Sequence, residues 1–120
     1  MSSIDRQLAG DVLVIDLGAE QARTSDPAAL ERSGRSARTL LKGGSLTVTL
    51  VSIAPGGAIA EHQADGTITV QPLEGTIRFS ALGTEYELSP GQLLSAGPGV
   101  RHAVSSETGG SFLLTVGKPA

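Results

Sequence analysis

Glycine and proline divide this chain into short apolar segments, and that punctuation is the feature that most limits its fold. The segments are rich in Val, Ile, Leu and Thr and are bounded by turns such as Pro55-Gly56-Gly57. Almost no helical period is present. The expected strands are Val12–Leu17, Ala37–Leu41, Leu46–Ile53, Thr67–Leu73, Thr76–Leu82, Glu85–Leu88, Gln92–Ser95, His102–Ser105 and Ser111–Val116. Short strands at roughly ten-residue spacing within 120 residues predict one all-β domain, a sandwich or a barrel.

Composition excludes several classes of function. The aromatic residues are only Phe79, Tyr86 and Phe112, and the net charge is -3, so a nucleic-acid partner is not expected. The absence of cysteine removes disulfides, thiolate metal sites and thiol catalysis. No apolar stretch approaches the length of a membrane span and no signal sequence is evident at the N-terminus, which predicts a cytoplasmic protein without a membrane partner.

The region from Gly18 to Ser36 is small and polar, and we expect an arm or loop there with one helical turn at Ala28–Glu31. Residues 1–36 are therefore predicted to form an N-terminal strand and arm, as part of the same unit as a barrel over residues 37–120. Two readings of the basic residues near this arm stay open. They are neutralised by nearby carboxylates on a solvated arm, or Arg35 or Arg38 binds the carboxylate of a ligand.

The two histidines stand in distinctive surroundings. Gly56 is followed after five residues by His62, and the strand after it ends in Leu73-Glu74-Gly75. His102 closes a second pattern that begins at Gly91 and passes through Gly97-Pro98-Gly99. In these two patterns, over roughly residues 37–117, the chain resembles the cupin superfamily, and it is similar to small single-domain bacterial cupins. The resemblance implies a double-stranded β-helix, the jelly-roll barrel of the RmlC-like cupins.

The resemblance also implies where a metal would bind. Metal-binding cupins carry four ligands at the positions that correspond here to His62, Ala64, Ile68 and His102. Ala64 and Ile68 cannot coordinate an ion, Gly97 stands in place of the motif's proline, and Ser106 replaces its asparagine. Two imidazoles are fewer ligands than protein metal sites usually supply. We therefore predict no certain cofactor, and at most a weakly held divalent ion (Zn, Ni, Fe or Mn) on His62 and His102.

Alternation along the strands suggests which side chains surround the histidines. Ile68 and Val70 should face the barrel interior, whereas Glu61, Gln63 and Gln71 should face outward; Asp65 lies where the chain turns and reaches inward only if the loop folds back. One reading is that both imidazoles are remnants of a metal site, bonded to each other or to water. The other is a small-molecule pocket formed by His62, Ala64, Ile68 and His102.

Three functions remain open on this evidence. The first is a homodimeric cupin that binds a small organic ligand or a weakly held metal, without clear catalytic residues. The second is a divalent-metal-dependent enzyme, an oxygenase or isomerase, that uses His62 and His102. The third is a barrel that serves only as a scaffold for dimerisation. The homodimer is expected from the resemblance and from the apolar residues Val12, Val14 and Ile15, which precede the barrel.

Overall fold

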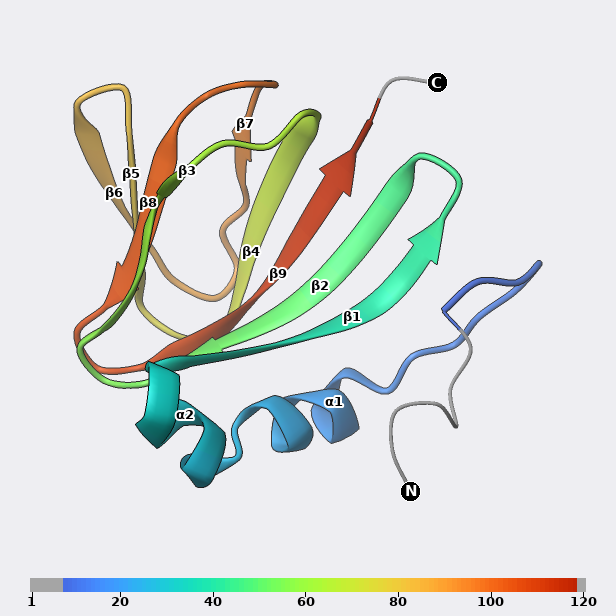
Figure 1. Ribbon diagram of the computed structural model, residues 1–120, viewed down its shortest axis with the longest axis horizontal. Helices are drawn as coiled ribbons and strands as arrows, with labels where there is room; N and C mark the ends of the chain where they lie inside the picture. Colours follow the sequence, from blue (N-terminus) through green and yellow to red (C-terminus); the bar gives the residue numbers. More distant parts are fainter. Residues whose placement is uncertain (1–7, 119–120) are drawn as a thin grey trace.

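The protein is an antiparallel β-barrel of two facing sheets, with two short helices against one of them (Figure 1). The computed structural model describes residues 8–118. The helices are α1 (Leu17–Thr24) and α2 (Pro27–Ser33). The strands are β1 (Arg35–Gly43), β2 (Leu46–Ile53), β3 (Gly57–His62), β4 (Thr67–Gly75), β5 (Ile77–Ala81), β6 (Thr84–Leu88), β7 (Leu94–Ala96), β8 (His102–Ser106) and β9 (Gly110–Gly117). One sheet has the order β1-β2-β9-β4-β7 and the other β3-β8-β5-β6.

The interior between the sheets is apolar. Alternation along each strand directs one set of side chains inward, and the buried cluster consists of Val51, Ile53, Ile68, Val70, Ile77, Phe79, Leu88, Val104 and Phe112. Ile68 and Val70 are in this core and Gln71 is exposed, as the sequence predicts. The all-β jelly-roll prediction is confirmed.

The prediction of a strand at Val12–Leu17 is wrong. Residues 12–16 are irregular and Leu17 begins α1, because the Asp16 carboxylate accepts a hydrogen bond from the Ala19 N–H (3.1 Å) and caps the helix. Val12 and Val14 are 84% and 93% exposed, so their alternation with other residues does not reflect a buried face. The helical turn expected at Ala28–Glu31 is confirmed within α2, whereas α1 and β3 were not expected. The predicted boundaries at residues 1 and 120 lie outside the described residues.

The arm packs against the outer face of the five-stranded sheet, where polar side chains make several of its contacts. The Ser52 hydroxyl donates to the Thr24 hydroxyl (2.8 Å), and the Gln21 amide donates to the Ser111 hydroxyl (2.9 Å). Arg38 pairs with Glu20, so it is neutralised within the chain instead of being available to a ligand. Among residues 8–118, no helix has the length and apolar character that crossing a membrane requires.

Candidate functional site

The two histidines lie side by side at one end of the barrel. His62 ends β3 and His102 begins β8, and the two residues are directly paired across these antiparallel strands. An irregularity in pairing between Ile59 and His62 shifts the alternation of β3 at this point. The ring centroids are 4.2 Å apart with an edge-on angle of 63°. The imidazoles are thus close neighbours on paired strands of one sheet.

Each imidazole is fixed by a hydrogen bond to its own strand or the turn before it. Nδ1 of His62 lies 2.9 Å from the Ala60 carbonyl oxygen, and Nδ1 of His102 lies 3.0 Å from that of Val100. A carbonyl oxygen only accepts hydrogen bonds, so both Nδ1 atoms donate and carry the proton in the neutral ring. Each Nε2 then keeps a lone pair that can accept a hydrogen bond or bind a metal ion.

The surroundings of His102 favour the neutral form. Its ring is 3% exposed and stacks on Phe79, with centroids 5.0 Å apart and an angle of 14°. Burial lowers the pKa of His102 and the charge of His62 lowers it further, although the hydrogen bond to Val100 opposes both. His62 is exposed, so this imidazole is the one that solvent reaches.

The other two positions that correspond to cupin ligands carry apolar side chains. Ile68 is fully buried in the core, and Ala64 is half-buried against it. The Ala64 carbonyl accepts a hydrogen bond from Gly99 N–H (2.9 Å), which ties the β3–β4 connection to the β7–β8 connection. A pocket shared by Ala64, Ile68 and the histidines stays a prediction.

Nearby carboxylates do not join the histidines. Glu61 is exposed and accepts a hydrogen bond from Arg101 Nε (3.1 Å), Gln63 faces solvent as expected, and Asp65 is also exposed. Within residues 8–118 no three His, Asp or Glu side chains form a group that could hold a metal ion. The donor set at this end is therefore two imidazoles.

The glycines that match the two cupin patterns have a common backbone reason. Gly56, Gly75, Gly91 and Gly99 all have positive φ, at 78°, 74°, 99° and 77°. Residues with a Cβ rarely adopt this region. Gly75 also lies against the Gly109 carbonyl, where an added Cβ would collide with backbone. The glycines of the two patterns thus allow the tight turns that place His62 and His102 at the same end of the barrel.

An apolar pocket of about 320 Å³ lies beside this end, and we call it the hairpin pocket. It is lined by Phe79, Ala81, Leu82, Tyr86, Leu94, Ser95, Ala96, Gly97 and Val100. Phe79 both lines this pocket and stacks on His102, so the pocket adjoins the buried imidazole. Sequence reasoning missed it, although inward alternation of Phe79 and Ala81 along the expected strand Thr76–Leu82 would have indicated part of its wall.

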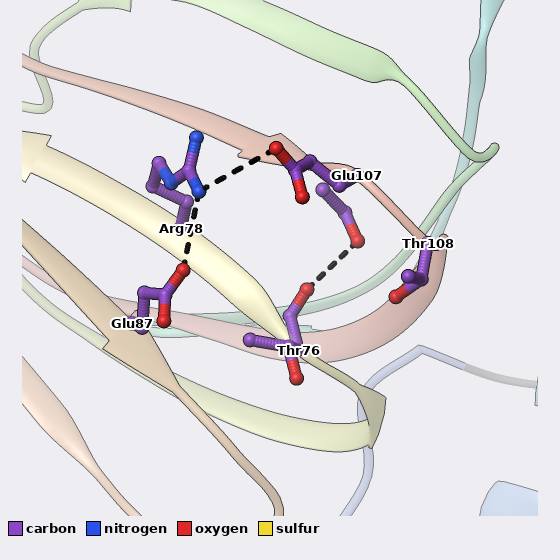
Figure 2. A pocket seen from close by; sticks show the side chains of 6 residues that line it. Thr76, Arg78, Glu87, Glu107 and Thr108 are labelled. Carbon is purple, nitrogen blue, oxygen red and sulfur yellow. Dashed lines mark hydrogen bonds and ion pairs between the residues drawn. The ribbon is translucent and has the colours of Figure 1, made fainter.

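A smaller pocket of about 200 Å³ opens where β4 joins β5 and β8 joins β9, and it is polar (Figure 2). Arg78 lies in it within 3.1 Å of a Glu87 carboxylate oxygen and 3.9 Å of one from Glu107. The hydrogen bond to Glu87 and the charges of Glu85 and Glu107 raise the pKa of Arg78. Because carboxylates already surround this guanidinium, the pocket is poorly suited to an anion.

Comparison with known proteins identifies the fold. No protein family model matches the sequence, and no curated protein matches it. Among solved structures, a conserved protein of unknown function from Streptococcus pyogenes is 24% identical, with a TM-score of 0.73 over 95% of this chain and 94% of that one. A cupin-2 domain protein from Shewanella frigidimarina is 15% identical, with a TM-score of 0.71 over 88% and 95%.

An enzyme is also among the structural matches. A mutant salicylate 1,2-dioxygenase from Pseudoaminobacter salicylatoxidans, in complex with gentisate, has a TM-score of 0.79 at 16% identity. The match covers 92% of this chain but only 35% of the dioxygenase chain. At these identities the likeness concerns the fold alone.

Proposed function

The chain has the cupin fold, and from that premise we propose that it binds a small organic molecule at the end of the barrel that carries His62 and His102. The observation that carries the proposal is the pair of adjacent imidazoles, each with Nδ1 bonded to a carbonyl and Nε2 left as an acceptor. A ligand hydroxyl or N–H group is the natural partner of such an acceptor. An apolar pocket beside a few convergent polar groups is the usual form of a small-molecule site.

A metal-dependent oxygenase or isomerase is the second candidate, favoured by the dioxygenase among the structural matches. The residues present do not fit a tightly held Zn, Ni, Fe or Mn ion, because Ala64 and Ile68 supply no donor and the nearby carboxylates face outward. Protein metal sites usually supply at least three ligands. We therefore favour the binding function over the enzymatic one.

Metal analysis separates the two candidates. After dialysis against a chelator, we expect the purified protein to retain well under one ion per chain, measured by elemental analysis. Calorimetric titration with Ni²⁺ should give weak binding that disappears in the His62→Ala variant and weakens as pH falls below about 6.5, where imidazole takes up a proton. If one ion per chain is retained through dialysis, the metalloenzyme proposal replaces the binding proposal.

Binding of an organic molecule is tested with cyclohexanol, which carries one hydroxyl donor on an apolar ring. In protein labelled with ¹⁵N-histidine, we expect cyclohexanol to shift the Nε2 resonances of His62 and His102 in a saturable way, with both Nδ1 atoms still protonated. Histidine resonances that stay unchanged at all concentrations would contradict the proposal.

We also propose that the chain forms homodimers through the segment around Val12 and Val14. Both side chains are large, apolar and almost fully exposed in the single chain, so a second copy that covers them would remove apolar surface from water. The double variant Val12→Ser/Val14→Ser changes no buried contact and should shift sedimentation from dimer to monomer at tens of micromolar. A wild-type protein that sediments only as monomer would contradict this proposal.

A further inference from the structure

The turn between β5 and β6 places leucine where leucine is unfavourable. Ala81 pairs with Thr84, so Leu82 and Gly83 form a two-residue hairpin turn. Both have positive φ, 51° and 78°, and Leu82 is the one non-glycine residue with positive φ among the residues that the structure describes. Turns of this kind usually carry Asn-Gly, because Asn tolerates the left-handed region far better than Leu does.

Nothing in the packing of the single chain accounts for that choice. The Leu82 side chain is 84% exposed, so it adds little to the stability of the core. It does line the hairpin pocket, together with Gly97 and Val100 of the β7–β8 connection. Backbone strain that the fold does not need tends to occur at functional sites, where it positions a group.

The lining of the hairpin pocket restricts what it can hold. None of its residues is Asp, Glu, Lys, Arg or His, and its polar side-chain groups are the hydroxyls of Tyr86 and Ser95. The neighbouring guanidinium group of Arg101 is paired with Glu61. A carboxylate or phosphate would therefore find no free cation here, and its desolvation would be uncompensated. The volume of about 320 Å³ equals roughly ten water volumes, enough for a ring or a branched alkyl group.

We propose that the hairpin pocket receives the uncharged alicyclic, aryl or branched-alkyl part of the ligand, and that Leu82 is a specificity residue that covers this group at the pocket rim. The inference rests on the proposed function, in which the polar group of the same ligand reaches the histidines. Phe79 lies next to both regions, because it lines the pocket and stacks on His102.

The chain contains a reporter for this pocket. Tyr86 lines it and is the only tyrosine of a protein without tryptophan, so intrinsic fluorescence reports on the hairpin pocket directly. Cyclohexanol does not absorb where tyrosine does, and cyclohexanecarboxylate is the matched charged probe. We expect saturable quenching or enhancement with cyclohexanol, and at least tenfold weaker binding of cyclohexanecarboxylate.

The decisive variant is Leu82→Asn, since asparagine suits the backbone of the turn but removes the apolar rim. We expect binding of cyclohexanol to weaken at least threefold while the urea midpoint stays the same or rises. Leu93→Asn is the matched control, because Leu93 is also exposed but does not line the pocket, and it should leave binding unchanged. Unchanged binding in Leu82→Asn would overturn the proposal.

The two proposals fail in different ways. If cyclohexanol shifts the histidine resonances without changing Tyr86 fluorescence, the pocket assignment is overturned and the proposed function stands. In the opposite case, cyclohexanol changes Tyr86 fluorescence in the wild type, binds more weakly to Leu82→Asn and leaves the histidine resonances unchanged. The pocket assignment is then supported, and the role of the histidines in binding is overturned.

Discussion

The two ends of the barrel differ in how their polar side chains are compensated. At one end, Arg78 is surrounded by Glu85, Glu87 and Glu107, and its charge is compensated at the surface. At the other end, His102 is buried against Phe79, which lines an uncharged pocket, and burial lowers the pKa of His102 and so favours the neutral imidazole. Compensated charges leave little for a ligand to add, whereas a neutral acceptor in an apolar setting can gain a partner from one.

The largest effect is expected from the buried ring at the histidine end. Phe79 and Arg78 are neighbours on β5, one buried in the core and one facing outward. Phe79→Ala should lower the free energy of unfolding by about 3–5 kcal/mol, because it removes a fully buried ring and leaves a cavity under His102. Urea denaturation measures this effect. A loss below about 1 kcal/mol would mean that the histidine end has no tightly packed wall.

Restoring the missing donors should convert the histidine end into a metal site. The double variant Ala64→His/Ile68→Glu supplies a ligand at each of the apolar cupin positions, and Ni²⁺ or Zn²⁺ affinity should rise by about 100-fold, equivalent to about 2.8 kcal/mol. Without metal, a carboxylate in place of buried Ile68 should lower the melting temperature. Calorimetry and thermal melts with and without Ni²⁺ test both effects.

An unchanged affinity in that double variant would mean that the side chains at positions 64 and 68 do not converge on the imidazoles. Ala64→His alone is the control, since it adds one donor without disturbing the core position.

Acid should destabilise the histidine end. The folded-state pKa of His102 lies below that of unfolded imidazole, so at pH values just under about 6.5 the unfolded chain takes up a proton that the folded chain does not. Stability is therefore complete above that pH and falls as pH decreases toward the folded pKa, by at most about 1.4 kcal/mol per pH unit for one group. Urea midpoints from pH 7.5 to 5 measure the slope, and the His102→Phe variant should reduce it. An equal slope in His102→Phe would assign it to other groups.

The smallest effect is expected at the charged end. Arg78→Ala should leave the urea midpoint nearly unchanged, because its ion pairs are exposed to water and salt screens them. Cyclohexanol binding should also be unaffected. A large loss of stability in this variant would show that the Arg78 end is structurally important and would remove the contrast between the two ends.

Much of the barrel was predictable because its corners require particular residues. The glycines at positive φ and the alternation of Ile68, Val70 and Gln71 identify strands and turns without any tertiary information. The pattern failed where local and tertiary requirements differ. Val12 and Val14 alternate as a strand would, yet Asp16 caps a helix directly after them and no partner strand pairs with them among the described residues.

The site was predictable in its residues but not in its arrangement. Spacing identified His62 and His102, but β3 has few β-branched residues, and the pairing irregularity after Ile59 that brings His62 beside His102 leaves no clear mark in the sequence. The hairpin pocket depends on contacts among β5, β6, β7 and the 97–100 connection, which are distant in sequence.

The helix α1 is attached to the sheet partly by side-chain hydrogen bonds and lies outside the barrel interior, so we expect it to open locally while the barrel stays folded. Its bonds involve Gln21 and Thr24, and the buried apolar cluster between the sheets includes no residue of α1. Backbone amides of α1 should therefore exchange their hydrogens through local opening, at a lower free energy than those of β2 and β9. Cleavage by a protease in the helical arm should therefore be faster than cleavage in β2 or β9.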